Sequence, residues 1–497
     1  MKDAVVDTSR WTKRNVWRSP SGQLIARPGL RNVYAPDSGR AVVGGFSVGN
    51  YAAGEIWHYV LDVATTTTGV VDGAPSGLRL SILDENFDVF WRLAVQAAGV
   101  PRAVSPIVVE GQMLVCSPDF PTLWGMVGST LKIAESQPSV SNLSVIAVPR
   151  GLACRWNNRP VVARGPALFV GDPVAATGGD LRSFVALNQN NRPSTVYGLH
   201  EAAGGMLVAL TADGVWGLDG SAAAVGVVDG NSGDWRLINH HRATSYDSSC
   251  VVRGRVYALT RRGWTLVDVE DGDEREIDDP EQSDVLMPRV AAADYRPARM
   301  YGGEDGPIVA LDAEDALHVT DVSRNLASWW KSDICGMRMR GVLRRNDGGE
   351  FLLCEDGVWH LSGNVDSDLL EGDSSDLPFA VLSGSVDPTP DVVRNLRQVH
   401  FAAAVGGADE TPMRCSVRGQ ASRTVVPDAD SAGLTVGEST WGQAGRRYTV
   451  TPYASVRFGW DEDTEASVEV GVVGGGVRID PQVVVDVVDK RRPDAEG

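Results

Sequence analysis

The chain has 497 residues, of which 43% are hydrophobic and 22% charged, and its formal net charge is −18. This length predicts about three domains, and the composition is that of a folded globular protein, not a disordered one. No apolar run reaches the roughly 18 residues of a membrane span, and the N-terminus lacks the apolar segment of a secretory signal. An acidic chain can border DNA, but it lacks the positive charge that binds phosphate backbones.

Residues 1–35 are predicted to form an extended docking arm. Residues 1–31 contain seven basic residues against Asp3 and Asp7, and too few aliphatic side chains to bury a core. Arginine and tryptophan are enriched at interface hot spots, so we expect the arm to act in assembly. A solvated tail and a DNA-gripping arm are the alternatives. The candidate docking residues are Arg10, Trp11, Lys13, Arg14, Trp17 and Arg18.

Residues 36–99 are expected to form a separate β-rich platform region. They contain two strand-like runs, EIWHYVLDVATTTTGVV and LRLSILDENFDVFWRLAV, which do not share the pattern of the segments that follow.

Residues 100–365 contain a repeated hairpin. Each copy is an apolar run, a tight polar turn and a second alternating run, and the clear copies start 49, 52 and 43 residues apart. Repeats of 40–50 residues are typical of β-propeller blades, which bury both faces of each small sheet by packing radially. With two looser copies, the sequence predicts about six blades, give or take one. The clear copies are LVALTADGVWGLDG, VYALTRRGWTLVDV, IVALDAEDALHVTD and FLLCEDGVWHLSG.

Aromatic and acidic residues within these repeats are interpreted as structural. Trp216, Trp264 and Trp359 follow the hairpin turn and are expected to be packing wedges between blades. The turn Asp229–Trp235 resembles the Asp-box of sialidase-type propellers, which is itself structural. That turn and Asp268–Asp273 are expected to be solvated, although carboxylates there could also hold calcium.

The C-terminal third is predicted to be a second β-rich body. Residues 366–379 are acidic and Ser-rich and are interpreted as a linker. Residues 380–497 are expected to form a β-sandwich or platform. Within them, residues 446–460 alternate apolar and polar side chains, as a half-buried antiparallel strand does.

No motif in the sequence indicates catalysis. The six cysteines are dispersed, without a Cys-X-X-Cys pair, which predicts free thiols in a reducing cytosol and argues against zinc. Adjacent residues on a strand point to opposite faces, so His240 and His241 cannot share a metal. Nucleophile-elbow, zincin and Walker motifs are missing. We therefore expect no catalytic residue, no cofactor, no metal site and no enzymatic activity.

The order of segments resembles the tail nozzle, or tail hub, proteins of short-tailed bacteriophages (the tail tubular protein B-like family of podoviruses). The resemblance rests on NVWRSPSGQLIARPGLRNVY (15–34), followed by RPVVARGPALFVGDPVAATGGDL and STVYGLHEAAGGMLVALTADGVWGLDG. It covers residues 15–365, and the C-terminal third adds only a general all-β similarity.

The resemblance implies a structural protein of the virion tail, made in the host bacterial cytoplasm. Such a protein would form a ring, expected to be a hexamer, that extends the portal and adaptor channel. The ring would retain the genome, conduct DNA without sequence-specific binding, and anchor fibres or spikes. The alternative from the fold alone is a propeller that binds carbohydrate or a receptor, or a propeller glycosidase.

Overall fold

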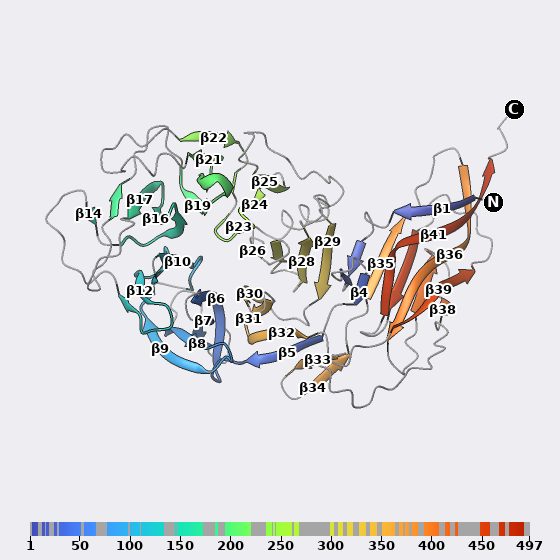
Figure 1. The fold of residues 1–497 in the computed structure, drawn as a ribbon, viewed down its shortest axis with the longest axis horizontal. Helices are drawn as coiled ribbons and strands as arrows, with labels where there is room; N and C mark the ends of the chain where they lie inside the picture. Colours follow the sequence, from blue (N-terminus) through green and yellow to red (C-terminus); the bar gives the residue numbers. More distant parts are fainter. Residues whose placement is uncertain are drawn as a thin grey trace. The chain divides into compact units, whose positions relative to one another are not determined.

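Two compact units make up the computed structural model (Figure 1): Asn32–Ala327 with Ile334–His360, and Met1–Arg31 with Ser328–Asp333 and Leu361–Gly497. In the second unit, side chains are described only for residues 30 and 31. In the first, they are described for residues 32–49, 54–65, 77–97, 100–109, 111–133, 148–171, 194–219, 235–240, 242–243, 245–258, 299–302, 338–344 and 350–360. The backbone is also described for the strands named below.

The first unit consists of small antiparallel sheets, because hairpins of alternating residues follow one another along the chain. The first two sheets are β6 (Arg40–Asn50), β7 (Glu55–Ala64), β8 (Leu78–Leu83) and β9 (Val89–Val95), then β10 (Ser105–Val109), β11 (Gln112–Cys116), β12 (Leu123–Met126) and β13 (Lys132–Ile133). The third is β15 (Leu152–Trp156), β16 (Arg159–Arg164), β17 (Ala167–Gly171), β18 (Phe184–Ala186) and β14 (Val145–Ile146).

Four more sheets follow in this unit. The fourth and fifth are β19 (Val196–Glu201), β20 (Leu207–Thr211), β21 (Val215–Leu218) and β22 (Arg236–Asn239), then β23 (Ser249–Val252), β24 (Arg255–Thr260) and β25 (Gly263–Val267). The sixth contains β26 (Arg299–Gly302), β27 (Pro307–Leu311) and β28 (Ala316–Asp321). The last contains β30 (Met339–Arg344), β31 (Glu350–Cys354), β32 (Gly357–Ser362) and, from the N-terminus, β5 (Gly29–Tyr34).

These sheets form a closed circle. Along it, β10 packs against β15, β15 against β19, β19 against β23, β23 against β26, and β26 against β30. Strand β30 then packs against β6, so the last sheet meets the first. The described residues thus form a β-propeller of seven sheets, which confirms the all-β propeller predicted from the sequence.

The first sheet, β6–β9, lies in the stretch that the sequence analysis placed in a separate platform region. In the structure it belongs to the same compact unit as the later sheets. Its strands β6 and β7 have 11 and 10 residues, longer than those of the repeated hairpins, and no Asp-Gly turn joins them. The repeat pattern therefore did not reveal it.

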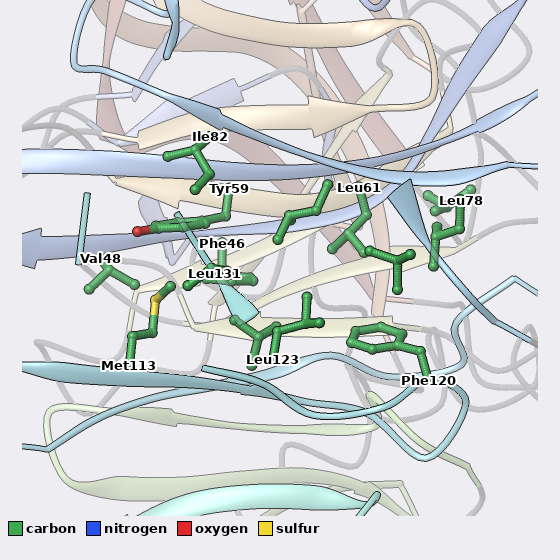
Figure 2. Close-up of a cluster of buried hydrophobic side chains, with 14 of the residues drawn as sticks. Phe46, Val48, Tyr59, Leu61, Leu78, Ile82, Met113, Phe120, Leu123 and Leu131 are labelled. Atoms are coloured by element: carbon green, nitrogen blue, oxygen red, sulfur yellow. The ribbon is translucent and has the colours of Figure 1, made fainter. Parts of the chain in front are cut away.

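The core between the first two sheets shows how neighbouring blades bury their faces (Figure 2). Phe46 stacks on Tyr59 with ring centroids 5.0 Å apart, and both pack with Met113, Phe120 and Leu123 of the second sheet and its loop. The Tyr59 hydroxyl accepts a hydrogen bond from the Gly128 amide at 2.9 Å. Apolar residues from both sheets thus form one continuous interface.

Strand β5 closes the propeller, because it completes the last sheet beside β32. Gly29 and Leu30, from the Arg-Pro-Gly-Leu sequence, begin this strand, and Leu30 is fully buried. Gly357 has φ +147°, and a Cβ there would collide with the Tyr34 carbonyl oxygen. Only glycine permits the backbones of β5 and β32 to approach in this way.

The second unit joins both ends of the chain. Strand β41 (Val477–Arg491) pairs with β36 (Val392–Gly406) and also with the N-terminal strands β1 (Lys2–Asp7) and β4 (Leu24–Ala26). Strand β36 also pairs with β39 (Tyr448–Arg457), which confirms a strand within residues 446–460. Strand β2 (Thr12–Arg14) pairs with β35 (Ala380–Ser385) and β29 (Ser328–Asp333). The remaining strands are β3 (Val16–Arg18), β37 (Met413–Val417), β38 (Arg423–Val425) and β40 (Ser467–Val472).

The acidic segment predicted as a linker, residues 366–379, contains a short hairpin. Strand β33 (Ser367–Leu370) pairs antiparallel with β34 (Asp373–Asp376), and Leu369 of β33 pairs with Arg31 of β5.

Candidate functional site

The cysteines that the structure describes are buried, apart from Cys154, which is partly buried. Cys116, Cys154, Cys250 and Cys354 are free thiols, and burial raises the pKa of each, that of Cys116 to about 12. Within the described residues, no group of three His, Cys, Asp or Glu side chains is placed to hold a metal. In the same part of the chain, no helix is both long and apolar enough to cross a membrane.

The repeated Asp-Gly-Val-Trp sequence forms a clamped turn. Asp213 Oδ1 accepts hydrogen bonds from Ser194 Oγ at 2.7 Å and from the indole Nε1 of Trp216 at 3.4 Å. In the last sheet, Asp356 Oδ1 accepts one from Trp359 Nε1 at 3.0 Å, and Trp359 is buried. In these two turns the aspartate holds the tryptophan in place, so the repeat is a structural signature. Trp264 and the segments Asp229–Asp234 and Asp268–Asp273 lie outside the described side chains.

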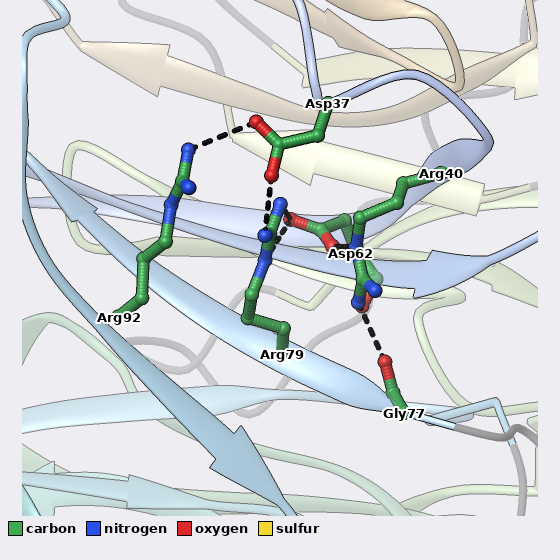
Figure 3. Close-up of polar contacts among 6 residues, drawn as sticks. All are labelled: Asp37, Arg40, Asp62, Gly77, Arg79 and Arg92. Carbon is green, nitrogen blue, oxygen red and sulfur yellow. Dashed lines mark hydrogen bonds and ion pairs between the residues drawn. The ribbon is translucent and has the colours of Figure 1, made fainter.

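A buried carboxylate holds the first sheet together (Figure 3). Asp62 in β7 is fully buried and forms ion pairs with Arg40 of β6 and Arg79 of β8, the latter at 3.1 Å. Arg79 also pairs with Asp37 at 2.6 Å, and Asp37 with Arg92 of β9 at 3.1 Å. The network therefore links all four strands of the sheet. Asp37, which precedes β6, connects Arg92 of β9 to the other three.

His58 lies where the first sheet meets the last. Its ring stacks on Phe87, with centroids 4.5 Å apart, and meets Phe351 of β31 edge-on at 6.0 Å. Ser47 Oγ lies 2.8 Å from His58 Nδ1 and accepts a hydrogen bond from the Arg344 amide of β30 at 2.9 Å. Burial lowers the pKa of His58 to about 4, against a smaller opposing effect of Asp84. The ring is therefore neutral at pH 7.

The name apolar ridge is used here for four apolar residues of the first two sheets. Val89 and Phe90 in β9 and Met126 in β12 are exposed, and Trp57 in β7 is partly buried. Phe90 is 55% exposed and meets Trp57 edge-on at 5.2 Å, while Met126 is 51% exposed. A Cβ at Gly128, in the turn after Met126, would touch Trp57, so the turn lies against that ring.

A β-bulge produces the exposure of Phe90. In the pairing of β8 with β9, Ile82 faces Trp91 and Leu83 faces Val89, so Phe90 is the extra residue. The sequence analysis treated this stretch only as strand-like. Its one available signal was the run Val89, Phe90, Trp91, where three large apolar residues interrupt strict alternation after an acidic turn.

The docking residues predicted from the sequence fall in the second unit. Lys13 and Arg14 lie in β2, where the backbone of Lys13 pairs with Leu382 and Trp330. Trp17 and Arg18 lie in β3, which pairs with β4. Arg10 and Trp11 lie outside the described residues.

Comparisons with known proteins assign the chain to no family. No family model and no curated protein matches the chain. Among solved structures, YCF48 bound to D1 peptide is 12% identical with a TM-score of 0.39, over 67% of this chain and 96% of that one. BamB from Moraxella catarrhalis is 11% identical with a TM-score of 0.35, over 72% and 97%. YCF48 and BamB are β-propeller proteins.

Removing the Asp62 carboxylate is expected to destabilise the fold, because beside a buried position Arg40 would lose its carboxylate partner and Arg79 one of its two. We expect Asp62→Ala to lower the free energy of unfolding by about 3–5 kcal/mol. Asp37→Ala is the matched control, since Asp37 is 48% exposed and exposed pairs contribute about 0–1 kcal/mol. Urea denaturation of both variants measures the difference. Equal losses would show that Asp62 has no special role.

The buried His58 predicts acid sensitivity. Its pKa is about 4 in the fold and about 6.5 in an unfolded chain. Between these two pKa values the unfolded chain binds a proton that the folded chain does not. The free energy of unfolding is therefore unaffected by His58 above pH 6.5, and falls by at most about 3 kcal/mol as the pH drops towards 4. His200, also with a pKa of about 4, titrates in the same window. The test is the difference between wild type and His58→Gln in urea unfolding at pH 7.5 and 4.5. An unchanged pH dependence would contradict the assignment.

Proposed function

We propose that the protein is a structural subunit of the tail nozzle of a short-tailed bacteriophage. The observation that carries the proposal is the order of the chain. The Arg-Pro-Gly-Leu segment begins the closing strand β5, the propeller follows, and a second β-rich unit combines both ends of the chain. The first two of these features lie within residues 15–365, which the resemblance covers, and the second unit is an addition to it. In this proposal the chain makes and breaks no covalent bond.

The charge of the chain supports a conduit for DNA. Each subunit carries −18, so a ring of six would carry −108. A negative wall repels phosphate and leaves DNA free to slide, whereas a basic wall would hold it through phosphate contacts. The proposed ring extends the portal and adaptor channel of the virion, retains the genome before infection, and anchors fibres or spikes. It conducts DNA without reading its sequence.

The proposal predicts ring-shaped particles. A hexamer of 53.0 kDa subunits would have a mass of about 318 kDa. We expect mass photometry and negative-stain electron microscopy of the purified chain, alone and with the adaptor of its phage, to show rings of this mass. A monomer that binds or cleaves a glycan, and that forms no ring with the adaptor, would contradict the proposal and favour a carbohydrate-binding or glycosidase propeller.

A further inference from the structure

Carboxylates surround one end of the apolar ridge. Glu55 is exposed two residues before Trp57 in β7. Glu85 and Asp88 are exposed in the turn that leads to Val89 and Phe90. An aromatic surface with a negative rim suits a partner that offers arginine and aromatic side chains, because guanidinium groups pair with carboxylates and also stack on rings.

The chain itself contains such a partner. Residues 8–18 read TSRWTKRNVWR, with four cations, two tryptophans and no carboxylate, in a protein whose net charge is −18. Within this stretch, β2 pairs with β35 and β29, so the basic segment belongs to the unit that also contains the C-terminus. The apolar ridge belongs to the propeller. The two complementary surfaces are therefore different parts of one chain.

We propose that the apolar ridge of one copy binds the basic segment 8–18 of a second copy. This inference rests on the proposed function, since it supplies the contact between ring subunits. An interface between two different surfaces is heterologous, so each copy can hold one neighbour through its ridge and another through its arm. Repetition of such a contact closes into a ring when the rotation allows it.

The test reverses the charge on each side of the contact. Rim variant Glu55→Arg with Asp88→Arg, and arm variant Arg10→Glu with Arg14→Glu, are each expected to weaken self-association about tenfold or more in sedimentation velocity. Combining all four substitutions in one chain should restore association to within about threefold of wild type. Ile133→Glu is the matched control, because Ile133 is also exposed, at 39%, but lies outside the ridge. It should leave association unchanged.

Cross-linking identifies which copies touch. Cysteines placed at Phe90 and at Trp17 should form a disulfide between two differently tagged copies, one carrying each cysteine. The inference would be overturned if no disulfide forms between the two tagged copies, while a single chain that carries both cysteines forms one within itself at any dilution. The inference would also be overturned if the wild type forms rings but the charge reversals have no effect on association, or if the combined variant is not rescued. In that case the proposed function would still stand. Charge-dependent pairing without any ring would leave the ridge contact and remove the nozzle. A wild type that never self-associates would remove both.

Discussion

Closure of the circle is the constraint on which the propeller depends. Each small sheet has two apolar faces, and a linear stack would leave one face of the first and last sheets in water. Here β30 of the last sheet packs on β6 of the first, and one cluster of buried side chains, including Val42, Phe87 and Phe351, lies between them. Strand β5 is tied into the same cluster through Tyr34. Strand β5 therefore has to be in place before the circle of sheets is complete.

Backbone amides of both sheets form hydrogen bonds across the closure. The Val42 amide donates to the Glu355 carbonyl at 2.8 Å, and the Arg344 amide donates to Ser47 Oγ. Asp62 sits nearby in the first sheet, surrounded by guanidinium groups. Buried polar groups cost several kcal/mol when unpaired, so such pairs favour one register over its neighbours. Strand β9, whose bulge presents Phe90 to solvent, is joined to this network through the ion pair of Arg92 with Asp37.

The sequence predicted the elements that depend on local chemistry. Asp-Gly-Val-Trp marks a turn because Asp213 and Asp356 bind the indoles three residues later, and this interaction needs no distant partner. It could not predict what depends on distant pairing. One example is the partner of the N-terminal arm, whose strand β1 pairs with β41, almost the whole chain away. The sequence Leu-Asp-Val around Asp62 also does not show that this carboxylate is buried. Its ion-pair partners, Arg40 and Arg79, come from two other strands. The exposure of Phe90 likewise follows from register.

Closure by β5 can be measured directly through Gly357. Alanine there would push a Cβ into the Tyr34 carbonyl, whereas alanine at Gly165, which also has a positive φ, meets nothing within 4 Å. Both substitutions place alanine at a positive φ, and only the one at Gly357 also collides with β5. Hydrogen exchange followed by mass spectrometry should show lost amide protection in β5, β31 and β32 for Gly357→Ala and little change there for Gly165→Ala. Equal protection of those strands in the two variants would contradict closure of the propeller by the N-terminal strand.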